Sequence, residues 1–92
     1  MYKITDYSYN QAKKLNVKIK PSKKSNSKID VYDNLNNYIT SIGHKNYNDY
    51  PTYILEKGKK YADERRKLYK TRHEDDRKVK NSRGYYAGKI LW

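Results

Sequence analysis

Lysine and arginine side chains, concentrated in two stretches of the chain, are the residues whose chemistry points most directly to a function. In the first stretch, 20–28, lysines stand among serine and asparagine; the second, 59–72, holds seven bases and two acids. Cationic side chains and neighbouring hydroxyl or amide donors suit phosphate oxygens. The expected phosphate contacts are Lys20, Lys23, Lys24 and Lys28 in the first stretch, Lys59, Lys60, Arg65, Arg66, Lys67, Lys70 and Arg72 in the second, and Arg77, Lys78, Lys80 and Arg83 beyond it.

Both stretches have a plainer interpretation as solvated surface. Acids interleave with the bases, and Asp63 with Lys67, like Glu74 with Lys78, has the four-residue spacing of an ion pair across one helical turn. A lysine-rich loop at 22–28 also improves solubility and discourages pairing between exposed sheet edges. The excess of bases remains after local pairing, which favours phosphate binding.

Tyrosine is almost the only aromatic residue, with Tyr 12, Trp 1 and Phe 0. The segment 47–53 is dense in tyrosine and turn-forming residues. It could stack on unpaired bases, or its rings could seal the junction between a strand and a helix. We expect the structural role, because tyrosine must supply much of the core of so polar a chain.

The sequence gives little sign of an enzyme or a metal site. There are no cysteines, and the two histidines, His44 and His73, are too few for a dedicated metal centre. Asp49 and Glu56 could share a helix face but have no third partner. We therefore expect no catalytic residues, no metal, no cofactor and no small-molecule substrate. No apolar run approaches the roughly 18 residues of a membrane span, so no membrane partner is expected.

The elements that must position these residues form one small domain over 1–92. In its first part, a short helix capped by Asp6 or Ser8 and ending near Leu15 precedes segments that alternate between apolar and polar residues. The expected strands are 17–20, 29–32 and 38–42. They predict a three-stranded antiparallel meander within about 1–43.

The second part, about 49–92, has helical periodicity. Asp49 followed by Pro51 is typical of a helix start, Gly58 of a helix end, and a longer helix should follow over 59–76. A basic loop is expected at 79–84. The overall prediction is an α+β fold, with the meander packed against this C-terminal helical half.

The segment 85–92 is the most apolar of the chain, and an apolar end is unlikely to stay in water. It should dock either on its own domain or on a partner. The side chains that would make such a partner contact are Tyr85, Tyr86, Ile90, Leu91 and Trp92.

Three segments together resemble a family of small basic proteins from nucleocytoplasmic large DNA viruses, including mimivirus-like and algal virus members. The residues 41–54 resemble its Gly-x-x-x-Tyr-x-Asp-Tyr segment, 62–74 its Glu-Arg-Arg-x-x-Tyr-x-x-Arg-His core, and 85–92 its Leu-Trp close. The resemblance implies a viral protein and a virion component, present in host cytoplasm or viral factories during infection. The family carries no assigned activity. Its matched Arg-Tyr helix face could be a ligand site or a structural network in which Arg72 stacks on Tyr69.

These observations predict a non-enzymatic small basic viral protein that binds nucleic acid through the phosphate backbone without sequence specificity. DNA is the favoured partner over RNA. The alternative is a minor capsid or cement protein that bridges larger coat proteins through the 85–92 segment. A host-directed interaction protein is a third possibility.

Overall fold

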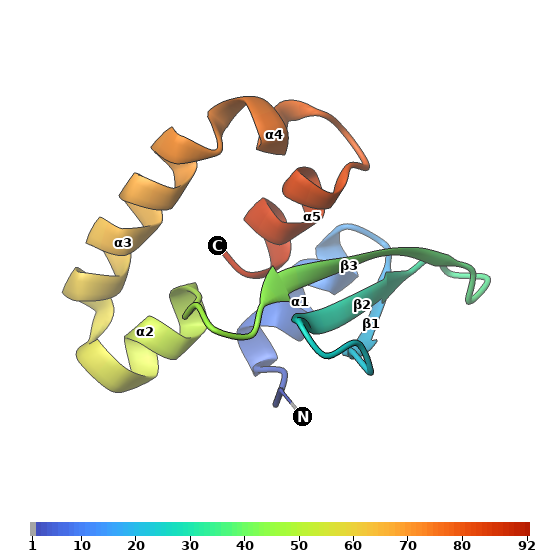
Figure 1. Cartoon of the computed structure of the whole chain (residues 1–92), viewed down its shortest axis with the longest axis horizontal. Helices are drawn as coiled ribbons and strands as arrows, with labels where there is room; N and C mark the ends of the chain where they lie inside the picture. Colours follow the sequence, from blue (N-terminus) through green and yellow to red (C-terminus); the bar gives the residue numbers. More distant parts are fainter. Residues whose placement is uncertain (1) are drawn as a thin grey trace.

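The computed structural model describes residues 2–92 and confirms the α+β class, with a three-stranded antiparallel sheet followed by helices (Figure 1). Met1 lies outside the described residues. The elements are α1 (Asp6–Lys14), β1 (Lys18–Pro21), β2 (Ser27–Tyr32), β3 (Tyr38–His44), α2 (Tyr50–Lys57), α3 (Lys59–Arg72), α4 (Glu74–Lys78) and α5 (Arg83–Ile90). Within 2–92, no helix is long and apolar enough to cross a membrane.

The sheet has the order β1-β2-β3, and one of its faces carries buried isoleucine and valine side chains. Ile19 pairs with Val31 and Ile29 with Ile42, and all four side chains are buried. Alternation in a strand sends every second side chain to the same face, so these residues form the base of the core. The helices α1 and α5 contribute Ala12, Tyr86 and Ile90, and Ile4 and Leu91 lie just outside these helices.

The C-terminal end of α5 is held by hydrogen bonds to other parts of the chain. The Ser8 hydroxyl donates to the Ile90 carbonyl at 3.0 Å, and the Gln11 amide donates to the Lys89 carbonyl at 3.1 Å. The backbone N–H of Tyr50 donates to the Leu91 carbonyl at 3.0 Å. Carbonyls in the last turn of a helix lack intrahelical partners, so these bonds tie α5 to α1 and α2.

Most helix boundaries follow the expected signals, with three corrections. Asp49 caps α2, as expected, by accepting from the Thr52 N–H at 3.0 Å. The cap of α1 is Thr5, whose hydroxyl accepts from the Ser8 N–H, and neither Asp6 nor Ser8. The expected helix 59–76 ends at Arg72, because His73 has a non-helical backbone (φ −109°, ψ 24°).

The helix α4 then begins with three acids, which favour the positive end of a helix dipole. The loop expected at 79–84 is also shorter than predicted. Ser82 caps α5 by accepting from the Tyr85 N–H, so the last helix already begins at Arg83. As a result, the apolar segment 85–92 is largely helical and lies inside the fold.

Candidate functional site

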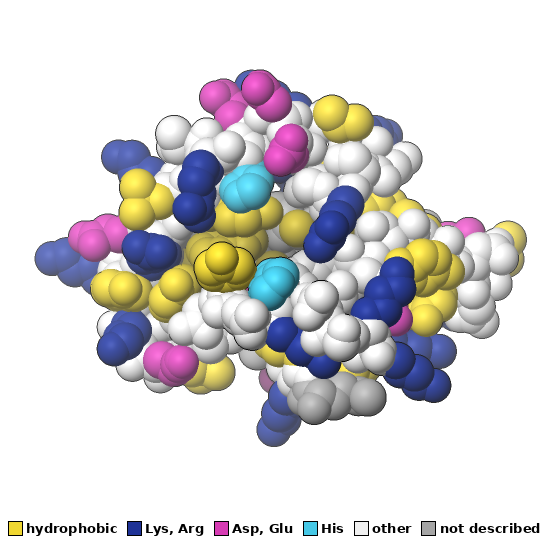
Figure 2. Space-filling model, in the orientation of Figure 1, with side chains coloured by type: hydrophobic (Ala, Val, Ile, Leu, Met, Phe, Trp, Pro, Cys, Tyr) yellow, Lys and Arg dark blue, Asp and Glu magenta, His cyan; other side chains and the backbone are white. Residues whose placement is uncertain are grey.

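A groove of about 870 Å³ opens between the end of β3, the loop before α2, the helices α3 and α4, and α5. Figure 2 shows this face of the molecule: hydrophobic side chains gather at its centre, and Lys, Arg and His side chains surround them. The aromatic and positively charged residues that line the groove are Lys28, His44, Tyr47, Tyr53, Arg65, Tyr69, Arg72, His73, Arg83 and Trp92.

The floor of the groove is a set of stacked rings. The Tyr69 ring lies 4.4 Å from the Trp92 ring with the planes only 6° apart, and 4.4 Å from the His73 ring at 27°. Tyr53 meets Trp92 at a centroid distance of 6.1 Å. These side chains are half-buried, so part of each ring stays open to the groove. Tyr69 is thus the inner ring of a stack, and a planar group can add to this stack at its outer rings, Trp92 and His73.

Trp92 is placed in the floor by contacts behind it. Arg66, on α3, donates from Nε to the Trp92 backbone oxygen and from Nη2 to the Tyr7 hydroxyl at 3.1 Å. Its guanidinium also lies 4.2 Å from the centre of the Tyr50 ring. Arg66 therefore connects α3, α1 and the end of the chain, and holds Trp92 beside Tyr69.

Three arginines form the rim: Arg65 and Arg72 from α3, and Arg83 from the start of α5. Within residues 2–92 none of the three has an ion pair. The Arg65 guanidinium lies 5.7 Å from the centre of the Tyr53 ring, which sets it against the floor.

The arginine charges near the groove affect the pKa of Tyr69 in its floor. Burial, and then the charge of Asp76, raise the pKa of Tyr69, while the positive charges of Arg72, Arg77 and Arg83 oppose that rise. Asp76 also lines the groove, with its carboxylate 3.3 Å from the His73 Nδ1, and the three arginines outnumber it. The rim therefore keeps an excess of positive charge above an aromatic surface.

The expected single basic patch divides into three clusters. Arg65, Arg72 and Arg83 line the groove. Arg66, Lys67, Lys70 and Arg77 line a second depression on another side of α3. Lys20, Lys23 and Lys24 lie at the exposed end of the β1–β2 hairpin, where Lys20 and Lys24 are 5.3 and 5.0 Å from the Tyr32 and Tyr38 ring centres.

The remaining expected contacts lie outside these clusters. Lys59 pairs with Asp63 at 2.9 Å, and Lys78 with Glu74 at 3.0 Å. Asp63 thus pairs with Lys59 and not with Lys67, because the Tyr50 hydroxyl also binds the Asp63 carboxylate at 2.7 Å and holds it toward α2. Lys60 and Lys80 are exposed.

Lys28 does not belong to the exposed loop, and its assignment to that loop was wrong. It lies in β2 with only 4% of its surface exposed. Its ammonium pairs with the buried Asp49 carboxylate at 3.0 Å and donates to the Tyr47 carbonyl. Although Lys28 borders the groove, its charge is already paired within the fold.

The expected partner contacts of the 85–92 segment are largely occupied within the chain. Tyr86, Ile90 and Leu91 are buried in the core at 5%, 0% and 1% exposure. Of the two docking possibilities, the structure shows docking on the chain's own domain. Tyr85 and Trp92 are half-buried, and Trp92 lines the groove.

The tyrosines of 47–53 have divided roles. Tyr50 is 4% exposed and its ring meets Tyr7 at 5.5 Å, which agrees with the structural role expected for this segment. Tyr53, in contrast, lines the groove, and Tyr47 is 70% exposed beside His44. The rings stacked on Tyr69 are those of His73 and Trp92, in place of the Arg72 stacking that one of the two alternatives for this helix face contained.

Sequence reasoning missed the histidines and the pairing of Tyr69 with Trp92. The spacing of Tyr61, Arg65, Tyr69 and His73, each four residues from the last, was the available signal, since residues four apart share a helix face. The contribution of Trp92 carries no comparable signal. It depends on the return of α5 to α3, which is a tertiary contact.

The comparisons with known proteins add no assignment to this geometry. No family model matches the chain, and neither the curated proteins nor the solved structures contain a match.

Proposed function

We propose that the protein is a non-enzymatic nucleic-acid-binding protein that holds unpaired nucleotides in the groove. The bases lie on the aromatic floor, and the phosphates meet the arginine rim. The combination of stacked, partly open rings with three arginines that lack ion pairs carries this proposal. The resemblance to proteins of large DNA viruses supports DNA as the first ligand to test and the virion as the first place to look.

The chemistry of the groove favours binding that tolerates many sequences. A base stacked on an aromatic ring contributes about 1–3 kcal/mol whichever base it is, because each has a π face. Arginine can hold a phosphate with two parallel hydrogen bonds, which positions the backbone without reading the base edges. A groove of about 870 Å³ also lies within the usual range of roughly 300–1,000 Å³ for ligand sites.

The position of Arg83 adds independent support. It is the first residue of α5, where the helix dipole disfavours a positive charge. Within 2–92 no carboxylate pairs with it to offset that cost. A phosphate in the groove would supply the missing negative charge.

The test is binding of labelled single-stranded DNA, single-stranded RNA and a duplex of one sequence across a salt series. Three phosphate contacts to a single strand should give a slope of log affinity against log salt near −2, from about −0.7 per phosphate. Trp92, the single tryptophan, should lose fluorescence on binding, because it lies in the floor. Comparison of the two single strands decides between DNA and RNA.

Arg72→Gln and Arg83→Gln should each reduce the size of this slope by about 0.7. Lys14→Gln, on α1 and outside the groove, is the matched loss of one charge and should leave the slope nearly unchanged. Equal losses in all three variants would mean that only net charge matters. Absence of binding at low salt, or preference for the duplex, would overturn the proposal.

A further inference from the structure

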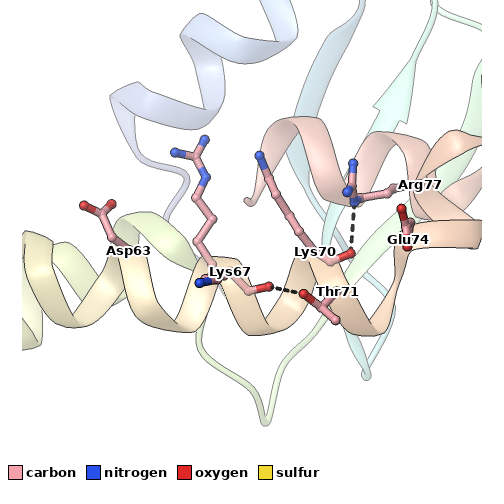
Figure 3. Close-up of a pocket in the computed structure, with 7 residues that line it drawn as sticks. Asp63, Lys67, Lys70, Thr71, Glu74 and Arg77 are labelled. Carbon is pink, nitrogen blue, oxygen red and sulfur yellow. Dashed lines mark hydrogen bonds between the residues drawn. The ribbon is translucent and has the colours of Figure 1, made fainter.

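Figure 3 shows the second depression, which has a volume of about 480 Å³ and also borders α3. Arg65 of the groove and Lys70 of the depression are five residues apart, which places them about 140° apart around the helix axis. The lining residues are Asp63, Arg66, Lys67, Lys70, Thr71, Glu74 and Arg77. One nucleotide cannot occupy both the groove and the depression, so the depression is a separate candidate site.

The two acids in the depression are already paired. Asp63 accepts from Lys59 and from the Tyr50 hydroxyl, and Glu74, at the Arg77 end, accepts from Lys78. Within residues 2–92, Lys67, Lys70 and Arg77 have no ion pair. The depression therefore has more positive charge than its own carboxylates neutralise.

The cations are held in position by the fold. Arg77 donates from Nε to the Lys70 backbone oxygen at 3.3 Å, and Figure 3 shows the two side chains next to each other on one side of α3. A Cβ built on Gly88 of α5 would lie 3.2 Å from the Arg77 Cβ, so the stem of Arg77 rests directly on that helix. The terminal nitrogens of Arg77 and the Lys70 ammonium make no hydrogen bond within the described chain.

The electrostatics of the depression favour an anion. Burial lowers the pKa of Lys70, and the positive charges of Arg66, Arg77 and Lys89 lower it further. Like charges are seldom gathered at a half-buried position unless something offsets their repulsion. A bound anion would reverse this effect and raise the pKa.

We propose that this depression is a phosphate-binding site, with Lys70 and Arg77 as its direct ligands and Lys67 at its edge. Arginine offers a planar fork to two phosphate oxygens, and lysine a compact charge to a third. The phosphate could belong to a free phosphorylated small molecule or to the backbone of a bound nucleic acid. The site does not depend on the groove proposal, because it uses other residues on another flank.

The first arm of the test uses inorganic phosphate against chloride at matched ionic strength, with the protein labelled at its lysine ε-carbons for NMR. Phosphate should shift the Lys70 signal and raise the pKa of Lys70. Lys70→Gln and Arg77→Gln should weaken phosphate binding about tenfold, as expected for loss of a charged hydrogen bond. Lys60→Gln, exposed at the start of α3 and outside the depression, should not.

The second arm uses a single-stranded oligonucleotide and identifies the source of the phosphate. If Lys70→Gln also weakens oligonucleotide binding and phosphate competes with it, the site takes backbone phosphate. If oligonucleotide binding is unchanged, the site takes a free phosphorylated molecule. Arg72→Gln should leave phosphate binding intact, so a failure of the groove proposal is seen separately. A response to phosphate no larger than to chloride, or an equal loss in Lys60→Gln, overturns this proposal.

Discussion

Asp49 supports more of the fold than its position in a polar loop suggests. Its carboxylate is 1% exposed and accepts hydrogen bonds from Lys28 Nζ at 3.0 Å, from the Tyr2 hydroxyl at 2.7 Å and from the Thr52 N–H at 3.0 Å. One side chain thus joins the N-terminal segment, β2 and α2. It also neutralises a buried ammonium, which would be costly without a partner.

Asp49→Asn should therefore lower the free energy of unfolding by about 3–5 kcal/mol, because it leaves Lys28 buried without a counter-charge. Urea denaturation gives this value directly. Asp63→Asn breaks an exposed pair and should cost far less than Asp49→Asn. Adding Lys28→Met to Asp49→Asn should recover part of the loss. An Asp49→Asn protein as stable as the wild type would contradict the structural role given to this pair.

Tyr2 predicts a loss of stability in alkaline solution. Burial, and then the hydrogen bond to Asp49, raise its pKa in the folded protein above the ordinary value of 10.0. Above about pH 10 the unfolded chain therefore loses this proton while the folded chain keeps it, so stability falls as pH rises. Tyr2→Phe should make that fall shallower by up to about 1.4 kcal/mol per pH unit. Denaturation between pH 9 and 11.5 measures the slope, and an unchanged slope would contradict the expectation.

Among the elements, the junction of β3 with α5 depends on Gly43. Its φ is +77°, and a Cβ there would lie 2.7 Å from Leu91 Cδ1 and 3.0 Å from Lys28 Cδ. Gly58, between α2 and α3, has a φ of +89° but nothing within 4 Å of such a Cβ. An alanine at Gly43 would therefore meet both backbone strain and a steric clash, whereas an alanine at Gly58 would meet backbone strain alone.

Gly43→Ala should cost about 2–4 kcal/mol of stability, since it adds a clash in the core to a left-handed backbone. Gly58→Ala should cost about 1–2 kcal/mol from the backbone alone. Thermal unfolding of the two variants gives the comparison. Equal losses would show that Leu91 moves aside without cost and that α5 is packed less tightly on the sheet than the structure indicates.

Some of the helices and strands could be predicted from the sequence, and others could not. Local signals were sufficient for the meander and for α2, because alternation, Asp49 and Gly58 act within a few residues. They failed at 59–76, where His73 interrupts a periodic pattern. At 85–92 they left open whether the apolar segment docks on its own domain or on a partner. The groove was least predictable, since its floor joins Tyr69 to Trp92, twenty-three positions later in the chain. Charge counts identified its arginines but not which of them lie together.

Over the whole molecule, lysine and arginine side chains far outnumber the ion pairs that the described residues form. The net charge is +12, and the described residues form four ion pairs, one of which involves a histidine. Unpaired like charges repel one another and destabilise a compact state, most strongly at low ionic strength. A charged residue whose role is binding should therefore lower the stability of the folded protein, whereas a charged residue with a structural role should raise it.

Arg83 and Lys89 test this distinction on a single helix, since Arg83 lies at the positive end of α5 and Lys89 in its last turn. Arg83→Gln should raise stability by about 0.3–1 kcal/mol at low salt, because it removes a charge that the helix dipole disfavours. That corresponds to a rise in Tm of about 1–8 °C for a domain of this size, fading as salt screens the interaction. Lys89→Gln should lower Tm. If Arg83→Gln lowers Tm instead, the arginine serves the fold, and its unpaired charge no longer supports a phosphate in the groove.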